Sequence, residues 1–106
     1  MQMVVYSAIC VLIYIASMKK IINKFGTIRY YNENDEYHRE DGPAIEYACG
    51  DKSWYKNDKL HREDGPAIEF ADDRKEYWYN DIEYPNIKSD EEWIRFVKLI
   101  IFLWKK

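Results

Sequence analysis

The sequence predicts a mainly β protein: an antiparallel meander or solenoid of about two and a half hairpin units, with an apolar segment before it and a capping α-helix after it. Three observations predict this fold class. The nonamer HREDGPAIE occurs at residues 38–46 and again at 61–69, and the distance between the two copies defines a repeat period. Short alternating apolar and polar stretches are separated by turn residues. The C-terminal residues have acids at the start and lysines at the end, as is favourable in a helix. The 106 residues therefore divide into 1–18, 19–27, 28–84 and 85–106.

Residues 1–18 contain no charged side chain, and Lys19 and Lys20 follow directly. At ~1.5 Å per residue, a helix of this length nearly spans the hydrocarbon of a bilayer. A membrane anchor is one interpretation, in which the lysines place the rest of the chain on the cytoplasmic side. A buried strand or core helix is a second, and translation that starts only at Met18 is a third. Residues 19–27 are predicted to be a basic linker.

Charge is distributed unevenly along the chain. Residues 1–29 carry four basic and no acidic side chains, residues 30–84 carry 7 basic and 16 acidic ones, and residues 85–106 carry 5 basic and 3 acidic ones. An acidic centre argues against nucleic-acid binding. Basic flanks suit an anionic membrane surface, so membrane contact is predicted through residues 1–18 and the flanks. The two cysteines form no CxxC pattern, which favours a reducing compartment and predicts no metal.

Each repeat unit is predicted to contain short strands joined by tight turns. Strands are expected at 44–48 and 52–56, and a third short stretch at 59–61. Gly50 supplies a positive φ to the first turn, and Asn57-Asp58 forms a two-residue turn. Stepping back by one period maps Trp54 onto Tyr31, which adds an earlier half unit from near Ile28. The strand aromatics are predicted to form the core and one exposed face, at positions Tyr31, Trp54, Tyr55, Tyr77 and Trp78.

The repeated nonamer admits a structural and a catalytic interpretation. In the first, it forms a corner between hairpins, at His38, Arg39, Glu40, Asp41, Gly42 and Pro43 and again at His61, Arg62, Glu63, Asp64, Gly65 and Pro66. Gly42 takes a conformation forbidden to other residues, the arginines pair with neighbouring acids, and the histidines pack on aromatic rings. In the second, the histidines are general bases or metal ligands beside the acids. Their spacing of two strands, roughly 10 Å, is too wide for one shared metal.

The C-terminal residues predict a helix from about Asp90 to Trp104. Ser89 and Glu92 have the spacing of a capping box, and acids in the first turn suit the helix dipole. The second half of this helix is apolar all round, so we expect it to be buried, in the first place against the sheet. Residues 1–18, a partner or lipid are the other surfaces considered.

The run WYKNDKLHREDGPAIEYACG resembles MORN-type repeats, and more closely their variant NGKLHREDGPAIEYADG, which is common in large DNA viruses of amoebae and occurs in bacteria and phages. The resemblance covers about residues 28–84 and implies a β-hairpin repeat. Asn57-Asp58 and Asn80-Asp81 replace the family's Asn-Gly turns, which predicts some backbone strain at both aspartates. MORN repeats elsewhere are implicated in scaffolding and membrane-lipid contact.

Two functions follow as hypotheses. The first is a non-catalytic module for protein–protein interaction or scaffolding, without a cofactor, either membrane-tethered or cytoplasmic, or a viral component. Self-association through an open sheet edge is expected with it. The alternative is a small metal-dependent or acid–base hydrolase that uses the HRED corners.

Overall fold

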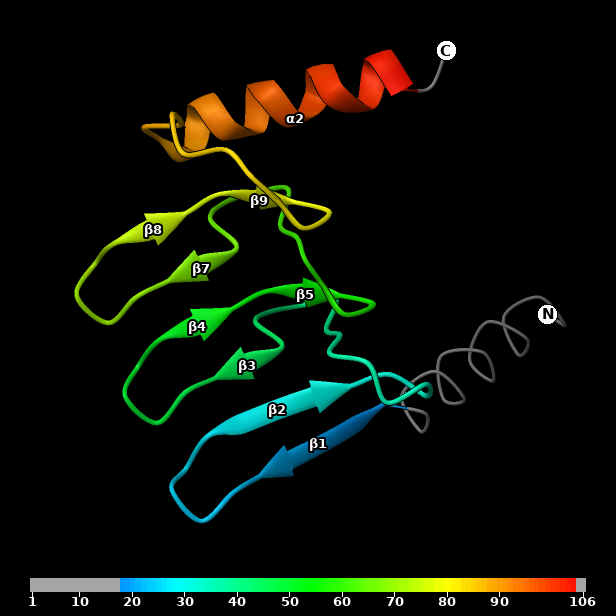
Figure 1. The fold of residues 1–106 in the computed structure, drawn as a ribbon, viewed down its shortest axis with the longest axis vertical. Coiled ribbons are helices and arrows are strands. Elements are labelled where there is room, and N and C mark those ends of the chain that lie inside the picture. Colours follow the sequence, from blue (N-terminus) through cyan, green and yellow to red (C-terminus); the bar gives the residue numbers. More distant parts are fainter. Residues whose placement is uncertain (1–17, 105–106) are drawn as a thin grey trace, which may run out of the picture.

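The protein, as a computed structural model that describes residues 18–104, is mainly β, with antiparallel hairpins and one C-terminal helix (Figure 1). A six-stranded antiparallel sheet has the order β1-β2-β3-β4-β7-β8. Two hairpins of two strands each, β5–β6 and β9–β10, form separate small sheets. The bounds are β1 Lys19–Ile22, β2 Ile28–Tyr31, β3 Ile45–Glu46, β4 Lys52–Ser53, β5 Tyr55–Lys56, β6 Lys59–Leu60, β7 Ile68–Glu69, β8 Lys75–Glu76, β9 Trp78–Tyr79, β10 Ile82–Glu83 and α2 Asp90–Trp104.

The strand expected over residues 52–56 is interrupted at Trp54. Strand β4 pairs with β3 and β7 in the large sheet, whereas β5 pairs only with β6. The backbone of Trp54 explains the break, because its N–H donates to Ala67 O at 2.7 Å while its C=O accepts from His61 N at 3.1 Å. The backbone of Trp54 thus bonds to two different segments, and the chain leaves the large sheet after this residue.

The predicted two-residue turns are confirmed. Asn57 and Asp58 both have positive φ, 50° and 66°, and Tyr55 pairs with Leu60 across them. Asn80 and Asp81 repeat this conformation in the β9–β10 hairpin with φ of 47° and 68°. Two consecutive positive φ values match the right-handed twist of the flanking strands. Gly50 has a φ of 102°, as expected for its turn.

Residues 19–27 were expected to be a linker, and this prediction is wrong. Lys19–Ile22 pairs with β2 along its whole length, and residues 23–27 close the hairpin. Asn23 Oδ1 accepts from the backbone N–H groups of Phe25 and Thr27, which orders the turn, and Gly26 supplies a φ of 91°. The sequence did not indicate this strand, because its two lysines and two isoleucines do not alternate. In the structure, the ammonium group of Lys20 lies over the ring of Tyr30 on the neighbouring strand.

The alignment of the first half unit is shifted by one residue. Tyr30, rather than Tyr31, makes the contacts that Trp54 makes later, since its N–H donates to Ala44 O at 2.8 Å and its C=O accepts from His38 N at 3.1 Å. The first turn is longer, with Tyr31 bridging to Tyr37. A constant period cannot reveal that extra residue.

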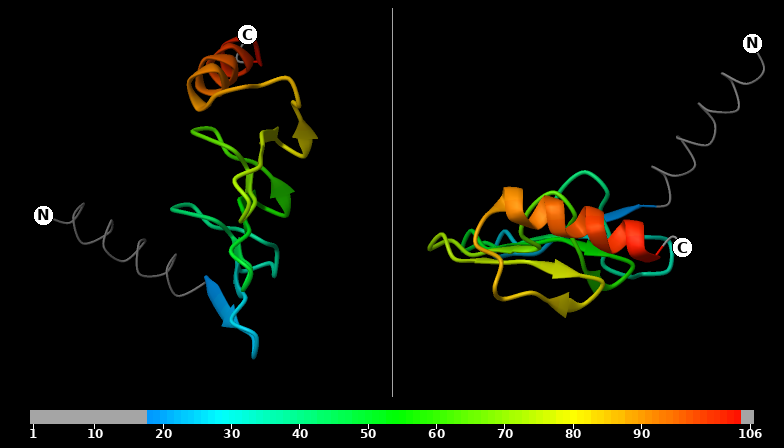
Figure 2. Two further views of the ribbon diagram at one scale, coloured as in Figure 1. Left: turned by 90° about the vertical axis from the view of Figure 1, so that its left-hand side faces the viewer. Right: turned by 90° about the horizontal axis from the view of Figure 1, so that it is seen from above.

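The predicted helix is confirmed, with bounds Asp90–Trp104. Ser89 Oγ accepts from Glu92 N at 3.1 Å, whereas the Glu92 carboxylate accepts from Lys88 N at 3.3 Å. Figure 2 shows the sheet as a thin layer with α2 across its end. The core cluster lies there, with Trp93 at 0% exposure packed beside Tyr77 and Val97.

The apolar second half of α2 is not buried against the sheet as expected. Ile101 packs against the core cluster, but Leu99, Leu103 and Trp104 are 60%, 62% and 70% exposed. The reason is geometric, because the end of the sheet covers one side of α2, whereas the second half of this helix is apolar on all sides. The membrane anchor proposed for residues 1–18 lies almost wholly outside the described residues, and within residues 18–104 no helix is long and apolar enough to cross a bilayer.

Candidate functional site

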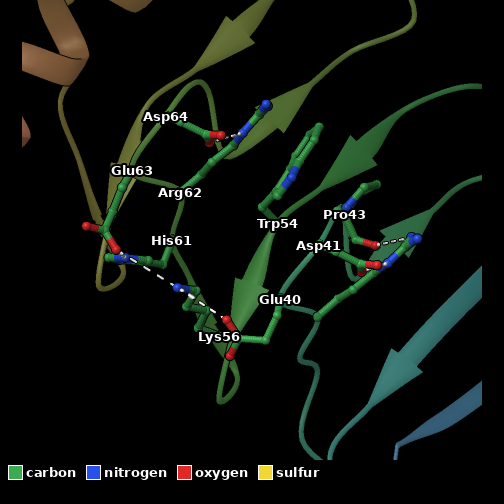
Figure 3. A pocket seen from close by; sticks show the side chains of 11 residues that line it. Glu40, Asp41, Pro43, Trp54, Lys56, His61, Arg62, Glu63 and Asp64 are labelled. Atoms are coloured by element: carbon green, nitrogen blue, oxygen red, sulfur yellow. Dashed lines mark hydrogen bonds and ion pairs between the residues drawn. The ribbon is translucent and has the colours of Figure 1, made fainter. Parts of the chain in front are cut away.

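The two HREDGP corners face each other across a cavity of about 500 Å³ (Figure 3). Residues 38–43 lead into β3 and residues 61–66 lead into β7, so corresponding side chains are displaced by two strands of the sheet. Trp54 and Lys56 line the cavity between the corners. For these residues the sequence predicted either structural corners between hairpins or catalytic groups.

Both nitrogens of each corner histidine face a partner. Asn57 N donates to His38 Nδ1, and Asn80 N donates to His61 Nδ1, each at 3.1 Å. A backbone amide can only donate, so Nδ1 is the acceptor and Nε2 carries the proton. His38 Nε2 lies 2.9 Å from Glu40, and His61 Nε2 lies 3.3 Å from Glu63. Neither buried imidazole retains a free lone pair for a metal or a substrate proton.

The corner arginines are held by stacking and hydrogen bonds at once. The Arg62 guanidinium lies 4.0 Å above the Trp54 ring, and Nε and Nη1 donate to Asp64 and to the Pro66 carbonyl at 2.9 and 3.1 Å. Nη1 also donates to Glu69 at 2.9 Å. Arg39 repeats the stack on the Tyr30 ring, at 4.0 Å. Its Nε and Nη1 contact Asp41 and the Pro43 carbonyl.

The corner glycines suit their positions for a reason other than the one predicted. Neither Gly42 nor Gly65 has a positive φ, so a forbidden backbone conformation is not the cause. A Cβ on Gly65 would lie 2.9 Å from Cζ of Arg62, and one on Gly42 would lie 3.0 Å from Cζ of Arg39. The glycines therefore leave room for a guanidinium group, a contact that sequence reasoning about turns did not reveal.

The carboxylates of the two corners are linked by one lysine. Lys56 Nζ lies 3.7 Å from Glu40 and 3.9 Å from Glu63, between the corners. Figure 3 shows its side chain between them. Asp41 and Asp64 pair with their own arginines. Within residues 18–104 no group of three His, Cys, Asp or Glu side chains is arranged to hold a metal ion.

Two aspartates whose role the sequence did not suggest join neighbouring hairpins. Asp81 Oδ1 accepts from Leu60 N at 2.7 Å, while its own N–H donates to Leu60 O at 2.9 Å. Asp58 makes the same pair of bonds with Tyr37, at 2.6 and 2.9 Å. These bonds offset the strain expected at the two positions. The occurrence of aspartate at the second position of both two-residue turns was the signal available in the sequence.

The aromatic positions separate into different environments. Tyr31, Tyr37 and Tyr55 form a row of rings with centroids 5.2 and 5.4 Å apart. Trp54 lies under a guanidinium at the corner. Tyr77 meets the helix, with its ring centroid 5.5 Å from that of Trp93. Trp78, the next residue, is half-buried and donates from Nε1 to the Glu76 carboxylate at 3.0 Å.

Trp93 fixes the helix on the second corner. Its Nε1 donates to Arg62 O at 2.8 Å, and Tyr77 Oη donates to Asp90 Oδ1 at 2.6 Å. Burial raises the pKa of Tyr77 above its ordinary value of 10.0, and the hydrogen bond to Asp90 raises it further. Burial also raises the pKa of Tyr55 and Tyr79. Trp93 therefore covers the end of the sheet, a role that the sequence pattern did not indicate.

No protein-family model, curated protein or solved structure matches this chain. The resemblance to MORN-type repeats therefore depends on the repeated motif in the sequence, and it stays a prediction.

Proposed function

We propose that residues 28–84 form a MORN-like solenoid that acts as a non-catalytic module for protein–protein interaction or scaffolding. The observation that carries this proposal is that both ring nitrogens of each corner histidine, and Nε and Nη1 of each corner arginine, have partners within the fold. A general base needs a free lone pair that reaches the substrate. At both corners the lone pair of the imidazole is taken by a backbone amide from the next hairpin.

The recurrence of contacts supports a repeat. The bond between His38 and Asn57 recurs one period later as that between His61 and Asn80. The bond from Arg39 N to Tyr55 O recurs from Arg62 N to Trp78 O, both at 3.3 Å. Contacts made only between adjacent units are the property of a solenoid.

Two surfaces are suited to a protein partner. The row of Tyr31, Tyr37 and Tyr55 is half-buried on the hairpin side, and tyrosine is enriched where proteins meet. Strand β1 leaves one edge of the large sheet unpaired within the described chain. An open edge can accept a strand from a partner or from a second copy of this chain.

We also propose that residues 1–18 tether the module to a membrane, with residues 28–84 on the cytoplasmic side. The length of the uncharged run and the lysines that follow it support this topology. The occurrence of the motif variant in viruses of amoebae supports a place in a virion or an infected cell.

A paired substitution separates the module from the alternative hydrolase. In the full-length protein, His38→Gln with His61→Gln should lower stability by about 1–3 kcal/mol, because buried donors lose an aligned acceptor. Bound metal, measured by elemental analysis, and hydrolytic activity should not change. Loss of a bound metal or of a hydrolytic activity without loss of stability would contradict the module and favour the hydrolase.

The tether is tested by extraction from native membranes. The full-length chain should stay in the membrane fraction in alkaline carbonate and leave it only in detergent. Release by carbonate alone would contradict a spanning segment. A binding partner is then sought with the detergent-extracted chain, using alanine at Tyr37 and Tyr55 as the variant expected to lose it.

A further inference from the structure

The end of helix α2 presents an exposed apolar surface. Leu99 and Leu103 are one helical turn apart and share one side of the helix. Trp104 follows at the last turn and makes an edge contact with Tyr79, with ring centroids 6.2 Å apart. All three side chains are more than half exposed. A surface of this kind on an otherwise charged module indicates a binding site.

The charged side chains of the C-terminal segment beyond the first turn of α2 are all basic. The acids of α2 lie in its first turn, and after Glu92 the sequence contains Arg95, Lys98, Lys105 and Lys106 and no acid. Arg95 and Lys98 are exposed. Apolar side chains interleaved with cations match the two layers of an anionic lipid surface, in which phosphate groups lie above acyl chains.

The fold brings this surface to the side of the sheet at which the described chain begins. Strand β1 begins, and helix α2 ends, on the same side of the sheet in Figure 1, and the view from above in Figure 2 agrees. Residues 1–17 join the described chain at this side, immediately before Met18. A bilayer that holds residues 1–17, as proposed above, would therefore lie at the side on which α2 ends.

We propose that the end of α2, residues 99–104, inserts into the surface of an anionic bilayer as a second membrane contact. The proposal depends on the tether described above, and adds a site outside the repeats. The β5–β6 and β9–β10 turns, which contain Asp58 and Asp81, also lie on this side. The attraction to anionic headgroups would therefore come from the cations of α2 and of β1, and not from the acidic turns between them. The open sheet edge of a second copy is a poorer occupant, because Lys19 and Lys20 on that edge carry the same charge as Arg95 and Lys98 of α2.

The end of α2 is already folded before it contacts lipid. Trp93 and Val97 are buried against the last unit and hold the helix in place before lipid arrives. The exposed residues beyond them project from that support. Helices of this type lie ~5–10 Å deep, at the boundary between headgroups and acyl chains, which is within reach of one or two helical turns.

A fluorescent label on the full-length chain tests the insertion. An environment-sensitive dye is attached at Leu103→Cys, with both native cysteines changed to Ser, and at Asp72→Cys as a matched control. Asp72 is exposed in the β7–β8 turn, at the opposite side of the sheet. Both proteins are reconstituted into phosphatidylcholine vesicles, with or without phosphatidylserine, and flotation is measured in parallel.

The expected result is a blue shift at residue 103, and quenching by brominated acyl chains, that are stronger with phosphatidylserine and absent at residue 72. Adding Leu99→Glu should remove the quenching at residue 103 while the chain still floats. Flotation without quenching at residue 103 would overturn the insertion and leave the tether standing. Failure to float would overturn the tether and, with it, the insertion. A blue shift that is present before lipid is added would show that the surface is covered by residues 1–17 or by a second copy, and would also overturn the proposal.

Discussion

Alanine at Gly65 should destabilise the protein only while Arg62 is present. The added Cβ would lie 2.9 Å from Cζ of Arg62, closer than such atoms approach. Because Gly65 has no positive φ, alanine meets no left-handed strain there. The guanidinium must therefore move, and it is held by the Trp54 ring and by three acceptors.

The size of the effect follows from what the guanidinium loses. A hydrogen bond to a charged group contributes about 1.5–3 kcal/mol, and a cation–π contact about 0.5–1 kcal/mol. The arginine end is flexible and 22% exposed, so part of this is recovered by a new arrangement. We expect Gly65→Ala to cost about 1–3 kcal/mol of unfolding free energy. With Arg62→Ala already in place, the same change should be neutral, or stabilising by about 0.4–1 kcal/mol through the unfolded chain.

The assay is urea unfolding of the four proteins that make up this double-mutant cycle. Gly50→Ala is the control, since its φ of 102° makes alanine costly, by about 1–2 kcal/mol, whether or not Arg62 is present. An equal cost of Gly65→Ala in both backgrounds would refute the guanidinium explanation. If the Arg62→Ala protein does not fold, the corresponding pair of Gly42 and Arg39 provides the same cycle, with a distance of 3.0 Å.

Three further predictions concern contacts between units and with the helix. In urea unfolding, Asp58→Ala should cost about 2–3 kcal/mol and Asp58→Gly about half as much. Both variants lose the hydrogen bond from Tyr37 N, but glycine adopts the left-handed conformation without strain. Equal costs of the two variants would contradict this division. Tyr77→Phe should lower stability at neutral pH by about 1–2 kcal/mol through the lost bond to Asp90. Because the pKa of Tyr77 is raised above 10.0, its contribution is complete below pH 10 and is lost as the pH rises through that higher pKa, so thermal melts of Tyr77→Phe should depend less on pH above 10 than those of the native chain. Trp93→Phe should cost about 2–3 kcal/mol, since it opens a cavity and leaves a corner carbonyl unpaired, and a cost below about 1 kcal/mol in urea unfolding would argue against the helix as a cap.

The local features of this fold were accessible from the sequence. The turns at Asn57-Asp58 and Asn80-Asp81, and the helix that starts after Ser89, depend on backbone preferences of a few consecutive residues. The structural interpretation of the corners led to the correct general pairing of the arginines with Asp41 and Asp64. In each of these cases the interacting residues are close in the chain, so the residue types alone are enough to predict the contact.

Some of the features that the sequence did not predict depend on contacts between distant parts of the chain, which are decided by sheet register. The step from Tyr31 to Tyr30 follows from a longer first turn, and the break at Trp54 from a bond to Ala67. The sequence by itself determined the turns and the limits of the helix, because local conformational energies encode them. Only the tertiary structure decided that β1 joins the sheet, that the corner glycines make room for guanidinium groups, and that the end of α2 stays exposed, because each of these depends on which surfaces meet once the strands have stacked.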